Sequence, residues 1–478
     1  MSREMSVEMQ ARMRKLAVAL MPFADVATTD FPLSRILRLS LFQVSVGMAL
    51  VLITGTLNRV MIVELGVPAW FVALMVALPV VFAPLRALIG FRSDVYQSAF
   101  GIRRIPFIWA GTLAQWGGLA IMPFAILILS GGGHGPIIYG QLGAGLAFLL
   151  VGAGIHTTQT AGLALASDLA REDLRPRVVA LLFVMLLAGM FASALIFGWL
   201  LQDFTAGRLI RVIQGAAVVT LVLNLVALWK QEPRGLARRV GVSSATSFTA
   251  AWQELRQNPR SLRLLVATAI GTAGFTMQDI LLEPFGGQIL GLSVSATTAL
   301  TAMLAGGMLV AFALSARSLG RGLDPHRLAA YGAVLGVIAF AMVAVVSGIH
   351  LHWLFTVGVC LIGLGGGLFA VGTLTAAMGL AKSGNNGLAL GAWGAVQATA
   401  SGAAIAVGGA LRDTVSNLAM DGTLGEVLAG PATGYAFVYY LEVFLLFATL
   451  VVIGPLAAFR GRDGGAGKSR FGLAEFPS

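Results

Sequence analysis

Three ionisable residues stand inside segments that are otherwise apolar, and their chemistry is that of a buried polar site. They are Arg59, Asp279 and Glu283. A charge at the centre of a bilayer costs about 2.5–3.5 kcal/mol on insertion scales, so such side chains face each other or a cavity rather than lipid. Asp279 and Glu283 are four residues apart and share one helix face. We therefore predict a central polar cluster in which Arg59 pairs with Glu283.

Two interpretations of this cluster remain open. In the first, the ion pair only joins two parts of a helical bundle. In the second, the three side chains form the polar floor of a cavity that opens toward lipid or toward a partner helix. Pro284 directly follows Glu283 and removes a backbone donor, which predicts a kink in the helix at this point.

The elements that must position these residues are membrane-spanning helices. The chain has 478 residues, of which 57% are hydrophobic and only 11% are charged, whereas soluble proteins carry about 25% charged residues. Apolar runs of about 20 residues predict a transmembrane helix each, and we count twelve, in an all-α integral membrane protein. The predicted spans are 36–63, 69–90, 106–130, 137–166, 178–201, 209–229, 262–290, 294–316, 328–347, 353–380, 388–411 and 435–459.

The basic residues predict the orientation of the chain. Most of the 32 Lys and Arg residues lie at the N-terminus, in alternate loops or in the C-terminal tail. The positive-inside rule then places both termini in the cytoplasm. This asymmetry explains the net charge of +11 without a nucleic-acid partner, and the scattered basic groups favour anionic membrane lipids instead.

The helices divide into two halves at a polar, basic stretch. Within that stretch Phe248, Trp252 and Leu255 have the spacing of a short amphipathic helix on the membrane surface. The N-terminal stretch has a similar apolar stripe, for which a solvated tail is an equal alternative. The predicted domains are an N-terminal segment 1–35, a six-helix bundle 36–230, a linker 231–260, a second six-helix bundle 261–459 and a tail 460–478.

The two halves also resemble each other in sequence. Gly198–Asp203 reads GWLLQD and Gly408–Asp413 reads GGALRD. Gly66 follows the first predicted helix and Gly291 follows the seventh, and aligning these glycines places Asn58 opposite Glu283. The pattern predicts a parallel repeat of six plus six helices.

The loop after the second predicted helix resembles the signature loop of the major facilitator superfamily. It contains Gly90 and Asp94, and then Gly101, Arg103 and Arg104. The resemblance implies the twelve-helix fold of that superfamily, with an acid and basic residues that latch the halves on the cytoplasmic side. Several extra residues separate Asp94 from Gly101, and this departure puts the usual gating role in doubt.

Longer motifs resemble one family, PucC/LhaA, also described as the bacteriochlorophyll delivery family. The resemblance implies a role in assembling bacterial light-harvesting antennas in the inner, intracytoplasmic photosynthetic membrane. Implied partners are antenna polypeptides, with reaction centre–LH1 assembly intermediates and bacteriochlorophyll synthase as further candidates, and LH1 is favoured over LH2. The motifs are GTLNRVMIVELGVPAW (55–70), RALIGFRSD (86–94), GIRRIPFIW (101–109), SDLAREDLRPRVVALL (167–182), MQDILLEPFGGQILGLSV (277–294) and GLALGAWGAVQA (387–398).

His156 and Gln159 are candidates for contact with a pigment. They lie one turn apart in an apolar span. A neutral imidazole in such a setting is a suitable axial ligand for the magnesium of bacteriochlorophyll, which would be a transient cargo. A histidine that is hydrogen-bonded to a neighbouring helix is the plainer interpretation of the same residue.

Two classes of function remain. The first is an assembly factor that chaperones antenna polypeptides, delivers bacteriochlorophyll within the membrane, or does both. The second is a secondary transporter or a tetrapyrrole exporter. We expect no enzymatic activity and no metal site, because the sequence has no phosphate-binding loop, no paired cysteines and no nucleophile constellation. A proton-coupled transporter needs carboxylates in several helices. The apparent clustering of the buried acids on one helix therefore favours the first class.

Overall fold

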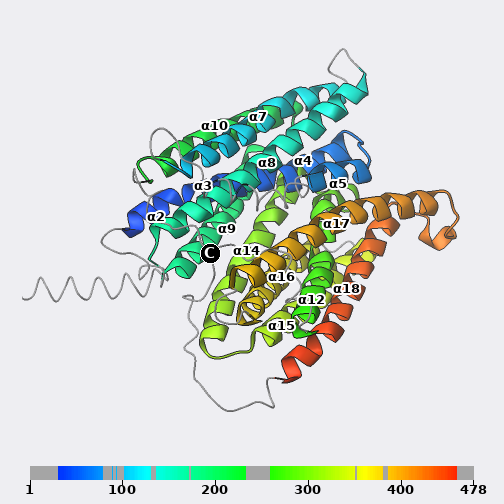
Figure 1. Cartoon of the computed structure of the whole chain (residues 1–478). Helices are drawn as coiled ribbons and strands as arrows, with labels where there is room; N and C mark the ends of the chain where they lie inside the picture. Colours follow the sequence, from blue (N-terminus) through cyan, green and yellow to red (C-terminus); the bar gives the residue numbers. More distant parts are fainter. Residues whose placement is uncertain are drawn as a thin grey trace, which may run out of the picture.

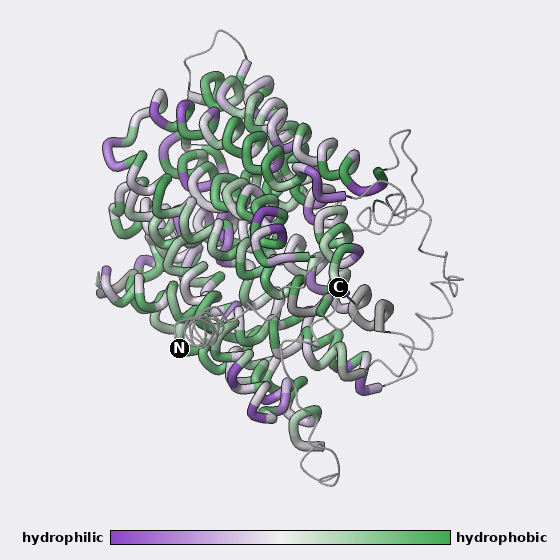
Figure 2. Tube along the Cα trace, turned by 90° about the vertical axis from the view of Figure 1, so that its left-hand side faces the viewer, coloured by the Kyte–Doolittle hydropathy of each residue, from purple (hydrophilic) through white to green (hydrophobic). Residues whose placement is uncertain are grey.

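The fold is a bundle of long helices, and the chain is a multi-pass membrane protein. The computed structural model describes residues 31–78, 89, 93, 102–130, 136–171, 174–232, 259–349, 352–380 and 386–459. Within these residues, eleven helical segments are long and apolar enough to cross a membrane. Figure 2 shows hydrophobic residues along the helix bodies and hydrophilic residues mostly near their ends.

The predicted count of twelve spans is not confirmed. The second predicted span is described only over α5 (Ala69–Ala77), and the rest of it lies outside the described residues. The same is true of three other expectations: the amphipathic helix of the linker, the N-terminal stripe and Asp94. They stay predictions.

The first half of the chain forms the upper group of helices in Figure 1. Its first span is not a uniform α-helix, because two π-helical stretches interrupt it on either side of Asn58. The elements are α2 (Leu33–Leu39), α3 (Leu41–Leu50), a π-helix (Val51–Thr56), α4 (Leu57–Arg59), a second π-helix (Val60–Glu64), α5, α7 (Ile105–Leu129), α8 (Ile137–Leu169), α9 (Arg175–Leu200) and α10 (Ala206–Leu228).

The second half forms the lower group in Figure 1, and its first span is also interrupted. A short 3₁₀ turn separates the two α-helical pieces of that span. The elements are α12 (Pro259–Thr276), the 3₁₀ turn (Met277–Ile280), α13 (Leu282–Gln288), α14 (Val294–Gly320), α15 (Pro325–Ile349), α16 (His352–Leu380), α17 (Asn386–Met420), a 3₁₀ turn (Glu426–Leu428) and α18 (Ala432–Phe459).

The two halves meet along three helix pairs. The first span packs against the interrupted span α12–α13, α9 packs against α14, and α5 packs against α17. Small residues permit the close approach in the last pair: a Cβ at Gly409 would collide with Ala73 and with the backbone of Ala69. These contacts bring the predicted central residues of both halves together.

The predicted repeat is visible in two matching turns. Gly66 and Gly291 have φ angles of 64° and 66°, a left-handed conformation that glycine adopts without steric cost. After each glycine the backbone N–H bonds back over six residues, from Val67 to Met61 and from Leu292 to Gly286. The alignment of these glycines therefore holds in three dimensions.

Candidate functional site

The seventh predicted span is broken at the centre of the molecule, and the sequence explains the break. Pro284 lacks the N–H that would bond to the carbonyl of Ile280, and its ring disfavours a regular helix through that point. The helix accordingly ends at Thr276, passes through the 3₁₀ turn and resumes at Leu282. The predicted kink is confirmed, and it begins several residues before the proline.

Side chains from other helices satisfy the backbone groups that this break frees. Asn58 Nδ2 donates to the carbonyl of Ile280 at 3.0 Å, the group that Pro284 cannot reach. Glu442 Oε1, from α18, accepts from the backbone N–H of Gln278 at 2.7 Å. Broken helices inside membranes need such partners because no water is available there. Side chains from one helix of each half therefore supply the hydrogen bonds that the broken helix lacks.

The predicted pair between Arg59 and Glu283 is not formed. Arg59 Nη1 instead contacts Glu64 Oε1 at 2.5 Å, and Nη2 donates to the carbonyl of Leu292 at 3.2 Å. The physical reason is the π-helix over Val60–Glu64, whose wider turn brings residues five apart onto one face. Arg59 is buried, with 4% of its surface exposed, and its ion-pair partner Glu64 lies within its own span.

Glu283 has a different environment from the one predicted. Thr301 of α14 donates a hydrogen bond to its Oε1, and a Cβ on Gly55 would collide with this carboxyl group. Its other oxygen has no hydrogen-bond partner within the described residues. Asp279 is half-buried in the 3₁₀ turn and accepts from the Gln278 amide. The cluster therefore exists, with the two acids held by neutral groups rather than by Arg59.

Glu442 is a central acid that the sequence-based prediction missed. It is fully buried in α18, and its second oxygen has no hydrogen-bond partner in the part of the chain that the structure describes. The expectation that the buried acids cluster on one helix is therefore wrong. The signal was available: Glu442 is the acid within the last predicted span, at a depth where acids are rare.

A second polar cluster joins α17 to α5, α13 and α18. Arg412 Nη1 contacts Asp413 Oδ1 at 2.6 Å, and Arg412 Nη2 contacts Gln288 Oε1 and the Tyr435 hydroxyl. Asp413 Oδ2 accepts from the backbone N–H of Trp70, the second residue of α5, at 2.7 Å. α5 has Pro68 at its N-cap and no capping side chain of its own, so the other half of the molecule supplies the cap.

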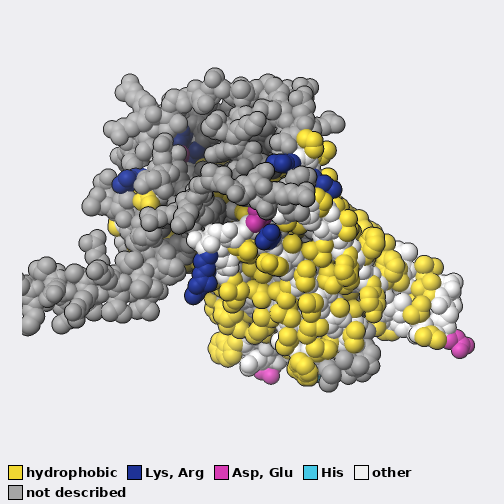
Figure 3. Space-filling view, turned by 90° about the horizontal axis from the view of Figure 1, so that it is seen from below, with side chains coloured by type: hydrophobic (Ala, Val, Ile, Leu, Met, Phe, Trp, Pro, Cys, Tyr) yellow, Lys and Arg dark blue, Asp and Glu magenta, His cyan; other side chains and the backbone are white. Residues whose placement is uncertain are grey.

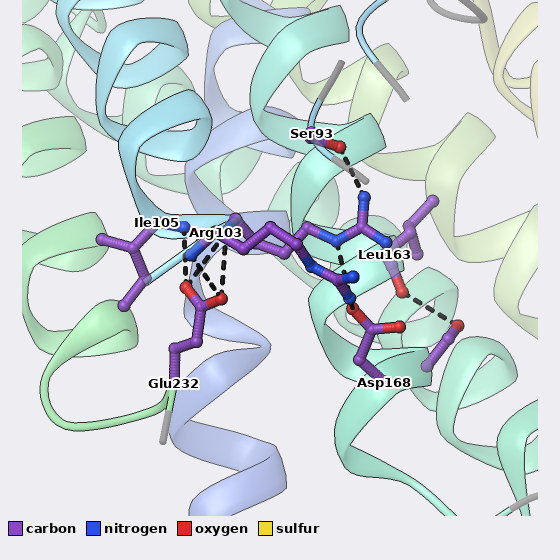
Figure 4. Close-up of polar contacts among 8 residues, drawn as sticks. Ser93, Arg103, Ile105, Leu163, Asp168 and Glu232 are labelled. Carbon is purple, nitrogen blue, oxygen red and sulfur yellow. Dashed lines mark hydrogen bonds and ion pairs between the residues drawn. The ribbon is translucent and has the colours of Figure 1, made fainter. Parts of the chain in front are cut away.

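The arginines of the predicted cytoplasmic latch lie at the opposite end of the bundle. Arg103 Nη2 and Arg104 Nε both contact Asp168 Oδ2, at 2.7 and 3.1 Å, and Arg104 also donates to Ser93 (Figure 4). Glu232 caps α7, because its carboxylate accepts the backbone N–H groups of Arg103, Arg104 and Ile105.

All of these latch partners belong to the first half of the chain. The predicted latch of Asp94, Arg103 and Arg104 stays a prediction, because Asp94 lies outside the described residues and the described arginine contacts lie within one half. Asp168 ends α8 and Glu232 follows α10, so the arginines tie three helices of one half together. The part played by Asp94 lies outside the described residues.

The corresponding loop of the second half uses a local cap. Asp324 Oδ1 accepts from the backbone N–H groups of His326 and Arg327 at the start of α15, and it contacts His326 Nδ1 at 3.2 Å. Burial raises the pKa of Asp324, but the hydrogen bonds and the charge of His326 outweigh it. They hold the pKa below its usual value. This loop also forms its contacts within one half.

The two pigment candidates have unlike surroundings. Gln159 is buried, and its amide donates to Gln43 Oε1 of α3 at 3.4 Å, so it joins two helices. His156 is half-buried on a face of α8 that also carries the half-buried residues Thr157 and Thr160. Of the two, only His156 is partly exposed.

The central region is rich in hydrogen-bonding groups. In the described residues no group of three or more His, Cys, Asp or Glu side chains is arranged to hold a metal ion. The region combines a broken helix, the buried acids Glu283 and Glu442, the half-buried Asp279, and two arginines that are each paired with an acid of their own span. Such an arrangement can bind protons or polar groups at membrane depth.

The architecture matches known transporters. The chain is similar to the solved structure of a bacterial homologue of the human lysosomal transporter Spinster in its inward-facing form. The TM-score is 0.66 at 13% sequence identity, and the match covers 91% of this chain and 98% of the other. At this identity the likeness shows the fold, which is that of the major facilitator superfamily, as predicted.

Two relatives are similar in sequence over most of their length. A protein of Rhodobacter capsulatus described as an uncharacterized protein in the puhA–bchM intergenic region is 53% identical, over 97% of this chain and 98% of its own. Protein PucC of Rhodovulum sulfidophilum is 55% identical, over 82% of this chain and 87% of its own. The family model for PUCC protein matches residues 56–460, a stretch that contains the broken helix, its partners and both arginine groups, and the chain therefore belongs to the PucC family.

Proposed function

We propose that the protein is an assembly factor for a bacterial light-harvesting antenna, and that it acts within the photosynthetic membrane. The observation that carries the proposal is the similarity to PucC proteins over almost the whole chain. A relative named for a gene interval between puhA and bchM supports it further. We favour LH1 over LH2 as the antenna served, with antenna polypeptides as partners and bacteriochlorophyll as cargo.

The outer surface of the bundle suits a partner that lies in the bilayer. The described part of the face in Figure 3 is largely hydrophobic, and its Lys and Arg side chains lie mostly along one border of the hydrophobic area. Large aromatic side chains such as Phe124, Trp353 and Phe444 are exposed on the outer helix faces. An antenna polypeptide crosses the membrane as an apolar helix, so it would dock by lateral packing rather than through a central channel.

The chain offers one residue for contact with pigment cargo. The imidazole of His156 is half-buried beside the half-buried residues Thr157 and Thr160. Bacteriochlorophyll would supply the magnesium, and His156 would hold it from one side. His156→Phe should lower the pigment that copurifies, whereas His352→Phe, at an exposed site on α16, should not. Equal pigment in wild type and His156→Phe would exclude this role.

The central experiment is photocrosslinking in the photosynthetic membrane. Photoreactive residues at Phe124, Trp353 and Phe444 sample three outer faces, and the same residue at the enclosed Phe285 is the control. We expect one outer face to capture an antenna polypeptide, and loss of the protein to reduce antenna assembly while pigment synthesis continues. No capture at any outer face would contradict the proposal.

A second candidate function is secondary transport. It is favoured by Glu442, because this acid on α18 and the acids of the broken helix give carboxyl groups on two helices at membrane depth. Flux of a soluble solute into proteoliposomes, driven by a proton gradient and abolished in Glu442→Gln, would replace the assembly model with this one. We expect no such flux.

A further inference from the structure

We propose that the groove between α9 and α10 is a binding site for an anionic phospholipid, with its acyl chain in the groove and its phosphate at Arg211. The proposal concerns a region that lies apart from the central cluster. It does not depend on which antenna or cargo the protein serves.

The groove lies between α9 and α10, two consecutive helices that pack mainly against other helices and little against each other. α9 packs mainly against α3 and α14, and α10 packs mainly against α3 and α7. The space between them has a volume of about 650 Å³, within the range of about 300–1,000 Å³ that is typical of ligand sites. Its floor is Met48 of α3, which is buried. The remaining lining residues are Ser193, Ile196, Phe197, Trp199, Leu200, Gln202, Asp203, Arg208, Arg211, Val212, Gly215, Ala216 and Val219.

The lining is divided along its length. The part farther from the α9–α10 turn consists of apolar or small residues such as Ile196, Gly215 and Val219, whereas the charged residues stand at the end near that turn. Trp199, which is 68% exposed, lies at that same end, near the last turn of α9. Exposed tryptophans mark the headgroup level of a bilayer. An amphiphile would therefore lie with its polar group at this end and its chain toward the bilayer centre.

The charged end of the groove, which we call its mouth, favours an anionic occupant. Arg208 and Arg211 are one turn apart on α10, and Asp203 is the acid among the lining residues. Arg208 Nη1 contacts Asp203 Oδ2 at 2.8 Å. Arg211 Nε reaches only the carbonyl of Gly207, at 3.4 Å, and no acid contacts it within the described residues. The mouth thus carries an excess positive charge.

A phosphate satisfies Arg211 better than the other groups available at this depth. The guanidinium group binds phosphate oxygens through two parallel hydrogen bonds, and each basic residue at an anionic surface contributes about 1 kcal/mol, or about fivefold in affinity. A zwitterionic lipid brings its own cation to the mouth, which offsets the attraction of its phosphate to Arg211. Charge complementarity therefore selects phosphatidylglycerol or a lipid like it.

Native mass spectrometry of the purified full-length protein tests the site. The protein is exchanged into equal mixtures of phosphatidylglycerol and phosphatidylcholine, and the retained lipids are counted. We expect a preference for phosphatidylglycerol that Arg211→Gln lowers about fivefold. The matched control is Arg263→Gln, an exposed arginine of α12 outside the groove.

A second variant separates the groove from general surface charge. A Cβ at Gly215 meets no atom within 4 Å, and Gly215 lines the groove, so Gly215→Trp places a large side chain in the groove from an open backbone position. It should abolish the tightly retained lipid, whereas Gly454→Trp, at an equally open glycine of α18, should not. Equal retention of both lipids, unchanged retention in Gly215→Trp, or capture of a polypeptide in place of lipid at a photoreactive Val219 would each overturn the proposal.

Discussion

The last residues of α9 and a segment within α17 carry related sequences, but the acids of the two segments have different surroundings. In Gly408–Asp413 the acid is enclosed: the Asp413 side chain is 13% exposed and contacts both Arg412 and α5. In Gly198–Asp203 the acid faces outward: the Asp203 side chain is 85% exposed and contacts Arg208 at the mouth of the groove. Both segments lie on helices that pack against the other half, but the acid of Gly408–Asp413 takes part in that contact, whereas the acid of Gly198–Asp203 borders the groove between α9 and α10.

The difference originates in the neighbouring helix. α14, the partner of α9, begins at a serine: Ser293 accepts from the N–H of Ala296 and caps the helix locally. α5, the partner of α17, begins after Pro68, which has no side-chain acceptor. An exposed N-terminal N–H group needs a partner, so α5 uses Asp413 of the other half. A single capping residue thus decides whether the acid of the repeat is needed between the halves.

Gly409→Leu should have the largest effect of any change in this pair of regions. The new side chain would collide with Ala73 and the backbone of Ala69. Overpacking of this kind typically lowers the free energy of unfolding by about 1–3 kcal/mol, and occasionally by more. The aligned residue of the other repeat is Trp199, which is exposed, so Trp199→Leu is the control and should cost less than about 0.5 kcal/mol. The measurement is the free energy of unfolding in mixed detergent micelles. Equal losses of unfolding free energy for both variants would show that the two segments do not differ in this respect.

Asp413→Ala should destabilise the protein by about 2–3 kcal/mol. The change removes the cap of α5 and the acid that pairs with Arg412. Asp413→Asn keeps an acceptor for the Trp70 N–H and should recover about half of the loss. The same unfolding measurement applies, and a loss no greater than that of Asp203→Ala would mean that Asp413 does not join the halves.

Pro68→Ser should rescue part of Asp413→Ala. A serine at this N-cap would give α5 the local cap that Ser293 gives α14, a gain of about 1 kcal/mol. In the wild-type protein the same change should have little effect, because Asp413 already occupies the site. An equal gain in both backgrounds would show that the two caps act independently.

Asp203→Ala should have the smallest effect, below about 0.5 kcal/mol, because exposed ion pairs are weak. The difference from wild type should vanish at about 1 M salt, where the Debye length falls to about 3 Å. Thermal unfolding at low and high salt checks this. A loss that persists at high salt would place Asp203 in a structural role like that of Asp413.

The fold could be predicted from the sequence, but the side-chain contacts within the central cluster could not. Aligning Gly66 with Gly291 placed Asn58 opposite the seventh span, and the structure confirms that these spans face each other. Asn58 bonds to the carbonyl of Ile280 in the seventh span, whereas Arg59 does not pair with Glu283, because the π-helix after Arg59 turns its side chain toward Glu64. Helix periodicity assumes 3.6 residues per turn, so no pattern of apolar residues could reveal this change.

The described partners of the arginine cluster were also not predictable from the sequence. The usual gating role of the signature loop was already in doubt, and the structure shows Arg103 and Arg104 in contact with Asp168, while Glu232 caps the helix that they precede. Ser167–Asp168 was visible in the sequence as a polar helix end. Which acid an arginine reaches depends on the positions of helix ends, and boundaries are the least certain part of a sequence-based prediction.

The broken seventh span also constrains how the protein is made. Its freed carbonyl at Ile280 needs Asn58, which is synthesised long before it, whereas the freed N–H of Gln278 needs Glu442, which is among the last membrane residues to leave the ribosome. An unsatisfied backbone group in lipid costs several kcal/mol, so the span can settle only when the first and last helices flank it. The second half should therefore be unable to mature when it is expressed without the first, and a chain truncated before α18 should be retained as an unfinished substrate for membrane proteases.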